Sequence, residues 1–317
     1  MSGKSKLQQL SSTIRSKDAA QDESTIVGDV PWLLVLTGTI AAIYLVPIET
    51  GIMTAFKTQD GYLTSLPFLP PRTVTLAPWQ EAWNTLSGSF FNSLAFTVPA
   101  TILSATIGSL AAYGLTNTKW RGQTLIFVFF VAGTFIPIQS VLVPVSRFWA
   151  IVDIENVLQS VTPLDLWGLS FMEPHYATIV ELILTHTAFG IPIATLLFRS
   201  YYKNLSDEML EAARIDGAGL MSIYKNIVLP LSKPIFIVTF IYQFTSIWNG
   251  LLLSLIVAGA GPAAPITVDL NKLALAGRIP TYNTMMAGAF ITAIPTLIIY
   301  IFFGDKFVRG VAGYGGS

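Results

Sequence analysis

The chain of 317 residues contains no cysteine and only two histidines, His175 and His186. Without cysteine there can be no disulfide framework, no thiolate metal site and no cysteine nucleophile. Charged residues are also scarce, at 11%, whereas soluble domains carry about 25%. Lys+Arg and Asp+Glu both number 18, so no cationic surplus exists to bind a nucleic-acid backbone. These absences argue against most classes of soluble enzyme.

Apolar residues make up 52% of the chain, and its mean hydropathy is +0.61. A helix needs about 20 apolar residues to cross a bilayer core about 30 Å thick. Six segments reach that length: Val30–Met53, Phe90–Leu115, Thr124–Val145, Tyr176–Phe198, Pro234–Ala258 and Met285–Phe303. Four of them, the second, third, fifth and sixth, contain no charged residue. The sequence therefore predicts an all-α membrane protein with six transmembrane helices over residues 30–303.

The distribution of Lys and Arg predicts the orientation of these helices, because both residues are enriched on the cytoplasmic side of membranes. If the N-terminus is inside, most of the cations fall in inner segments, above all in the loop Arg199–Lys233. We therefore expect both termini in the cytoplasm, with residues 1–29 and 304–317 as tails. In the first outer loop, Pro78 suits the first turn of a helix that could run to about Leu86 along the outer membrane surface.

The long inner loop predicts a helix–turn–helix below the membrane. Asn204 or Ser206 can cap the first helix, which carries two acidic residues in its first turn and ends near Gly217. A second short helix would run from Leu220 to about Val228 and be ended by Leu229–Pro230. From these residues alone two interpretations stay open: a connector that packs on its own bundle, or a surface that docks a partner.

Within this loop, Glu211-Ala212-Ala213 is followed after three residues by Gly217, and after nine more by Ile227-Val228-Leu229-Pro230. The pattern resembles the EAA loop of ABC-importer permeases at every fixed position and in both gaps. Other segments resemble the carbohydrate-uptake subgroup of these permeases, of the shorter maltose-transporter type. They are Asn92-Ser93-Leu94, Ala111–Gly114, Ile215–Ala218, Trp248-Asn249 and Ile294-Pro295.

The resemblance implies a permease subunit that moves a sugar across the cytoplasmic membrane by alternating access. It implies three kinds of partner: a cytoplasmic ATPase dimer, a second permease and an extracytoplasmic solute-binding protein. The chain itself would catalyse no reaction and hold no cofactor or metal. The coupling helix would follow Gly217 and sit in a cleft of the ATPase. Glu211 would pair with the ATPase or brace the loop. Ile227, Leu229 and Pro230 would anchor the loop on the helix bundle. The residues implied in coupling within the loop 204–230 are Glu211, Ala212, Ala213, Asp216, Gly217, Ile227, Leu229 and Pro230.

Four residues in the predicted spans are candidates for a sugar pathway. Glu181 and His186 are the ionisable pair of the fourth span, and charged groups in a membrane are functional suspects. Because five residues turn a helix by about 140°, the pair alone would not chelate a metal. Asn249 could bond sugar hydroxyls while Trp248 stacks on the ring, but the same amide could bridge neighbouring helices.

Other functions remain as alternatives. An ion-coupled secondary transporter should show buried charges in several helices. An intramembrane enzyme needs a cluster of acid, base or metal groups. A channel would leave the inner loop unexplained. An ABC permease for another polar solute, such as a polyol or glycerol phosphate, would use the same loop. Gly3-Lys4-Ser5 lacks the earlier glycine of a phosphate-binding loop, so we expect the energy to come from a partner.

Overall fold

The computed structural model of the chain describes residues 31–118, 120–161, 165–170, 172–275 and 281–312. These ranges contain helices, turns and irregular segments but no strand. The chain forms two compact units, one up to Thr75 and the other from Leu76 onward. The predicted N-terminal tail, residues 1–29, and the last five residues lie outside the described ranges. The predicted all-α class is confirmed for the part of the chain that the structure describes.

The first unit consists of a long apolar helix and a short hairpin-like loop. Helix α2 (Pro31–Ala55) leaves its apolar side chains exposed along most of its length, as expected for a helix that faces lipid. Beyond it, the ammonium group of Lys57 donates to the carbonyls of Leu66 (2.6 Å) and Pro67 (3.2 Å), which closes the loop around α3 (Gln59–Thr64). Burial lowers the pKa of Lys57 from its usual value.

The second unit is built on two long helices, α4 (Ala77–Asn117) and α8 (His175–Tyr202), which pack on each other through small residues. A Cβ added at Gly108 would lie 2.5 Å from the Cβ of Ala194, so only glycine permits this approach. The surface helix predicted from Pro78 to Leu86 is wrong as a separate element, since these residues form the first part of α4.

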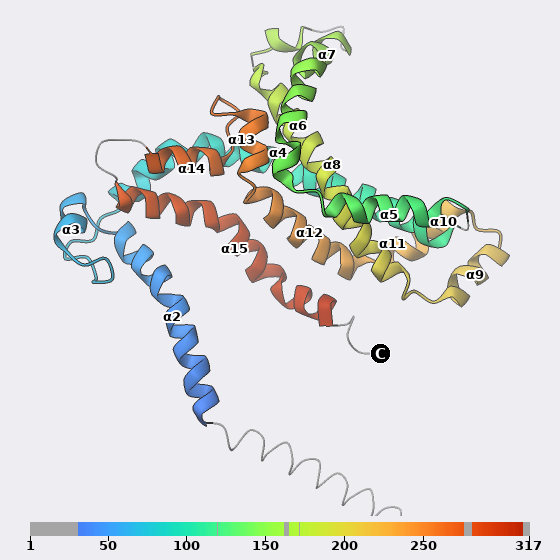
Figure 1. The fold of residues 1–317 in the computed structure, drawn as a ribbon, viewed down its shortest axis with the longest axis horizontal. Helices are drawn as coiled ribbons and strands as arrows, with labels where there is room; N and C mark the ends of the chain where they lie inside the picture. The colour runs from blue at the N-terminus through green and yellow to red at the C-terminus, as the bar shows by residue number, and fades with distance from the viewer. Residues whose placement is uncertain (1–30, 119, 162–164, 171, 276–280, 313–317) are drawn as a thin grey trace, which may run out of the picture. The chain divides into compact units, whose positions relative to one another are not determined.

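Three more helices and the segment between α13 and α14 complete the core of this unit. Helix α12 (Lys233–Trp248) packs on α4 and on α15 (Tyr282–Ala312), and α14 (Ile266–Leu275) lies against α4 and α15 (Figure 1). Two neighbouring side chains of α4 hold the segment that leads from α13 into α14. Asn92 donates to the carbonyls of Pro262 (2.8 Å) and Ala264 (3.2 Å), and the Ser93 hydroxyl accepts the N–H of Ile266 (2.8 Å).

Two of the predicted spans are interrupted. The third divides into α5 (Gln123–Thr134) and α6 (Ile138–Val152), and the path on through α7 (Ile154–Val161) bends by 99° at the break before Ile138, as Figure 1 shows. Pro137 stands at this break and lacks the N–H that a continuous helix would use.

The fifth predicted span, Pro234–Ala258, is wrong as one continuous helix. It divides at Asn249–Leu251 into α12 and α13 (Leu252–Ala258). The backbone N–H and the side-chain amide of Asn249 both donate to the Thr245 carbonyl, which ends α12. Gly250 then carries the chain into α13 without the steric limits of a side chain.

Four helices are long and apolar enough to cross a membrane alone, namely Trp32–Ala55, Ala77–Asn117, His175–Tyr202 and Tyr282–Gly304. Two bent pairs of helices raise the number to as many as six. The first pair is α5 with α6–α7. The second pair is the helical stretch Leu220–Leu231 with α12. The structure therefore shows a helical membrane protein with four to six candidate spans among the residues it describes.

Candidate functional sites

The chain between α8 and α12 begins with a capped helix, α9 (Asp207–Ile215). Of the two predicted caps it is Ser206 that acts, because its hydroxyl oxygen accepts the N–H of Met209 (3.3 Å). The same hydroxyl donates to the carboxylate of Glu208 (2.6 Å) and thereby lowers the pKa of that carboxyl group. This network fixes where α9 begins.

The end of α9 is fixed by Gly217, as predicted. This glycine has a φ of +82°, a left-handed conformation that side chains disfavour. Its N–H donates to the carbonyl of Arg214 (3.0 Å), and the next N–H, of Ala218, reaches back to Ala213 (3.0 Å). These two hydrogen bonds form a Schellman motif. No atom lies within 4 Å of a Cβ built at Gly217, so the backbone angle alone requires glycine here.

The predicted second helix, Leu220 to about Val228, is confirmed, but its predicted end at Leu229–Pro230 is wrong because the chain stays helical to Leu231. It passes from α10 (Leu220–Ile223) into a π-helix, η2 (Tyr224–Val228), and then into α11 (Leu229–Leu231). Pro230 does not end the helix, because it lies in the first turn of α11, where a missing N–H costs nothing. The path then bends by 75° into α12 at Ser232. We refer to residues 206–231 as the α9–α11 segment.

A cluster of hydroxyl groups holds the α9–α11 segment on the helix bundle. The Ser109 hydroxyl of α4 hydrogen-bonds with the hydroxyls of Tyr202 (2.6 Å) and Tyr224 (2.8 Å), which come from α8 and η2. All three residues are buried. Nearby, the Tyr113 hydroxyl donates to the carbonyl of Leu220 (3.0 Å). Ser109, Tyr113, Tyr202 and Tyr224 form the tyrosine hub, which sequence reasoning missed because its members lie far apart in the chain.

Two further contacts fasten the ends of the segment. The Arg214 guanidinium of α9 donates to the carbonyl of Asn117 at the end of α4 (2.9 Å). The Tyr201 hydroxyl donates to the carbonyl of Leu231 (2.7 Å). The α9–α11 segment is thus attached to α4 and α8 at several points along its length.

Most of the predicted coupling residues lie on the exposed side of this segment. Glu211, Ala212, Asp216, Gly217, Leu229 and Pro230 are exposed, and Ala213 and Ile227 are half-buried against the core. Leu229 is only 37% exposed, and the anchoring predicted for Leu229 and Pro230 stays a prediction. The fully packed side chains here are those of Tyr224 and Val228, which pack into the same hydrophobic cluster as Ile223.

Replacing Tyr224 with phenylalanine should lower the free energy of unfolding by about 1 kcal/mol, because it removes one hydrogen bond between buried groups. The exposed Tyr300 of α15 is the matched control, and Tyr300→Phe should change little. Denaturant unfolding of the purified protein in detergent measures both. In a double-mutant cycle, Ser109→Ala and Tyr224→Phe should be non-additive. Independent effects of the two substitutions would contradict the hub.

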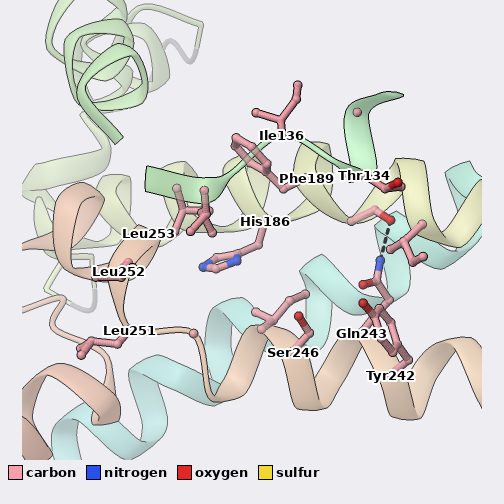
Figure 2. Close-up of a pocket in the computed structure, with 16 residues that line it drawn as sticks. Thr134, Ile136, His186, Phe189, Tyr242, Gln243, Ser246, Leu251, Leu252 and Leu253 are labelled. Atoms are coloured by element: carbon pink, nitrogen blue, oxygen red, sulfur yellow. Dashed lines mark hydrogen bonds between the residues drawn. The ribbon is translucent and has the colours of Figure 1, made fainter. Parts of the chain in front are cut away.

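A cavity of about 410 Å³ lies where the two interrupted helices meet α8. The end of α5, the start of α6, the end of α12 and the start of α13 all border it. Its polar side chains are Thr134, His186, Tyr242, Gln243 and Ser246, as Figure 2 shows. No lining residue is Asp, Glu, Lys or Arg.

Of the four predicted pathway residues, His186 alone lines this cavity. Its Nε2 hydrogen-bonds with the Ser254 hydroxyl of α13 (3.1 Å), and its ring stacks on Phe96 at 5.4 Å between centroids. Glu181 lies half-buried on α8 without lining the cavity. No three His, Asp or Glu side chains in the described ranges gather in a way that could hold a metal ion.

Trp248 and Asn249 do not form the predicted sugar platform at this cavity. Trp248 is only 1% exposed, stacks on Phe244, and donates its indole N–H to the carbonyl of Thr292 (2.9 Å). Asn249 is used in ending α12. The residue that sequence reasoning missed is Gln243, a buried amide that donates to the Gly190 carbonyl (2.7 Å) at the cavity wall.

Comparison with known proteins gives consistent matches. Residues 104–312 match the family described as binding-protein-dependent transport system inner membrane component. A xylose/arabinose import permease protein of Haloferax volcanii is 46% identical over 272 residues, covering 84% of this chain and 87% of that protein. A probable ABC transporter permease protein of Pyrococcus horikoshii is 39% identical over 275 residues, covering 86% of this chain and 91% of that protein.

A solved structure shares the fold. It is the crystal structure of a bacterial ABC transporter involved in the import of the acidic polysaccharide alginate. The match covers 90% of this chain and 98% of that one, with a TM-score of 0.63 and 21% sequence identity.

Proposed function

The chain belongs to the family of binding-protein-dependent transport system inner membrane components, and on this premise we propose that it is a permease subunit importing a carbohydrate. It is a multi-pass protein of the cytoplasmic membrane and a non-catalytic subunit of an ABC importer. The carbohydrate assignment is supported by the name of the relative from Haloferax volcanii, which imports xylose or arabinose.

We propose a topology of six spans with both termini in the cytoplasm. The four long helices, the bent pair of α5 with α6–α7, and the interrupted pair of α12 with α13 together support this number and leave the α9–α11 segment outside the membrane. The concentration of Lys and Arg between Arg199 and Lys233 supports a cytoplasmic location for the α9–α11 segment. Residues 1–29 and the end of the chain after residue 303 would then be cytoplasmic, with α15 continuing helical to Ala312 beyond the membrane.

The α9–α11 segment is proposed as the docking surface for a cytoplasmic ATPase dimer. Three large apolar side chains are exposed there around the Gly217 turn: Ile215, which is 81% exposed, Leu220 and Met221. Exposed apolar side chains that sit together on a rigid support are typical of protein–protein contacts. The tyrosine hub and Arg214 supply that support, so a force on this surface would be transmitted to α4 and α8.

The other proposed partners follow from the type of system. A binding-protein-dependent importer receives its solute from a solute-binding protein, which would contact the outer side. A second permease would complete the pathway. The described residues of this chain supply at most six membrane spans, and large apolar surfaces stay exposed on α2, α5 and α15.

The observation that carries the coupling proposal is Glu211, which is exposed and makes no hydrogen bond or ion pair with any described residue. Glu211→Ala should leave insertion and unfolding unchanged, because it removes no contact within the chain. Loss of a charge-assisted hydrogen bond across the interface, about 1.5–3 kcal/mol, should weaken ATPase binding roughly 10- to 100-fold. Co-purification of the ATPase and sugar-stimulated ATP hydrolysis in the reconstituted complex measure the effect.

The matched control is Glu155→Ala, which removes an exposed carboxylate on α7, outside the segment. It should leave ATPase binding unchanged. Wild-type ATPase binding and sugar uptake in Glu211→Ala would contradict the assignment of this surface. Purification of the chain alone, with no ATPase in any mild detergent, would instead favour a secondary transporter or a channel.

A further inference from the structure

Several polar groups that line the cavity between α5–α6, α8 and α12–α13 make no hydrogen bond with the described residues. The hydroxyl of Ser246 makes no hydrogen bond with any described residue, and neither does the Nδ1 atom of His186. Gln243 donates its amide N–H to Gly190 and keeps its carbonyl oxygen unbonded among the described residues. Figure 2 shows these three side chains around the same space. The cavity therefore offers both acceptors and donors to a ligand.

The backbone adds to this capacity because four helix ends border the cavity. Carbonyl groups at the ends of α5 and α12, and N–H groups at the starts of α6 and α13, lack some of their partners within the helix. Hydroxyl groups both donate and accept, so a polyhydroxylated ligand can pair with both kinds of helix end. Discontinuous helices are also where membrane transporters place polar solutes.

The apolar part of the lining suits the C–H faces of a sugar ring. Phe189 of α8 and Tyr242 of α12 both line the cavity. A volume of about 410 Å³ lies within the usual range for small-molecule sites, about 300–1,000 Å³. The neighbouring groove between α6 and α8 offers a ligand fewer polar groups. Its polar lining residues are Trp149 and Thr185, and the indole N–H of Trp149 already donates to the hydroxyl of Thr185 (2.8 Å).

Charge decides which carbohydrates fit. The lining contains no Asp, Glu, Lys or Arg, and the imidazole of His186 pairs with the neutral hydroxyl of Ser254, not with an acid. A carboxylate or phosphate group that entered would lose hydration without meeting a cation, which is strongly unfavourable in a membrane protein interior. A neutral sugar loses only hydroxyl hydration, and the polar groups of the lining replace it.

We propose that this cavity is a binding site for a neutral carbohydrate unit of monosaccharide or disaccharide size, and that it excludes uronates and sugar phosphates. Ser246, Gln243 and His186 bond the hydroxyls, while Phe189 and Tyr242 contact the ring. The inference rests on the proposed function and narrows it: the structurally similar transporter imports an acidic polysaccharide, whereas this site selects a neutral ligand. It also assigns direct contact with the solute to this subunit.

The absence of cysteine makes a direct test possible, because Ser246→Cys introduces the first thiol into the chain. The assembled complex would be treated with a maleimide, with D-xylose, D-glucose, D-glucuronate or glucose 6-phosphate present, and labelling of this subunit followed by mass spectrometry. At a concentration about ten times the dissociation constant, xylose or glucose should slow labelling about tenfold, because only the empty site reacts. The two anions should not slow it.

The matched control is Thr85→Cys, exposed near the start of α4 and away from the cavity, where none of the four probes should change labelling. In parallel, ATP hydrolysis stimulated by sugar-loaded solute-binding protein tests the proposed function itself. If hydrolysis is stimulated but no neutral sugar protects the thiol of Ser246→Cys, or the anions protect it equally well, the inference is overturned and the proposed function stands. If no carbohydrate stimulates hydrolysis or enters vesicles, both fail.

Discussion

Gly217→Pro should abolish coupled transport while the protein still inserts into the membrane. Proline holds φ near −65° and has no N–H, whereas this position needs a φ of +82° and donates to Arg214. The Schellman motif would be lost at a cost of about 1–2 kcal/mol for the backbone angle and about 1 kcal/mol for the hydrogen bond. The docking surface would be displaced, so sugar uptake and stimulated ATP hydrolysis should fall at least about tenfold.

Two variants separate the backbone effect from a general loss of folding. Gly217→Asn should retain more activity than Gly217→Ala, because asparagine tolerates the left-handed conformation better. Gly219→Ala should leave the backbone and the folding of the segment unchanged, since Gly219 has a φ of −71° and a Cβ there would meet no atom within 4 Å. Uptake in vesicles and size-exclusion profiles would be measured together. Normal coupling in Gly217→Pro would remove the turn from the mechanism.

Gly108→Val should strongly destabilise the second unit. Even the Cβ atom would lie 2.5 Å from the Cβ of Ala194 and 3.0 Å from the backbone nitrogen of Thr195, so α4 and α8 would have to separate. Overpacking alone costs about 1–3 kcal/mol, and valine adds two methyl groups beyond the Cβ. Against a typical stability of about 5–15 kcal/mol, the expected loss is large.

The control for this substitution lies on the same helix. A Cβ at Gly88 would meet no atom within 4 Å, so Gly88→Val changes helix propensity without changing the packing. We expect the yield of monodisperse protein to collapse for Gly108→Val and to stay near normal for Gly88→Val. Equal yields would show that the close approach of α4 and α8 is not needed for folding.

Hydropathy predicted where helices occur but not where they are interrupted. The first, fourth and sixth predicted spans coincide with α2, α8 and α15, because long uncharged segments have few other stable conformations in a membrane. The break in the fifth span was missed because Asn249 and Gly250 stand between strongly apolar residues. The Asn-Gly pair was nevertheless a turn signal that could have been used.

The α9–α11 segment was predicted better than the cavity, and the reason is the range of the interactions. The cap at Ser206 and the turn at Gly217 depend on hydrogen bonds between residues a few positions apart, which the sequence displays directly. The tyrosine hub and the contact of Gln243 with Gly190 join residues that are distant in sequence. Without the packing of α4, α8 and α12, nothing marks these side chains as special.

The helical path from η2 through α11 into α12 has a mechanical consequence. Only Ser232 separates the helical residues 220–231 from α12, so docking of the ATPase on the α9–α11 segment, as proposed, would tilt α12 about the bend at Ser232. Ser246 lies 13 residues beyond Lys233, or about 20 Å along the helix axis at 1.5 Å per residue. A tilt of about 5° would therefore shift Ser246 by roughly 1.7 Å. In the proposed complex the chain would act as a lever arm that converts a small movement of the ATPase into a change in the shape of the cavity.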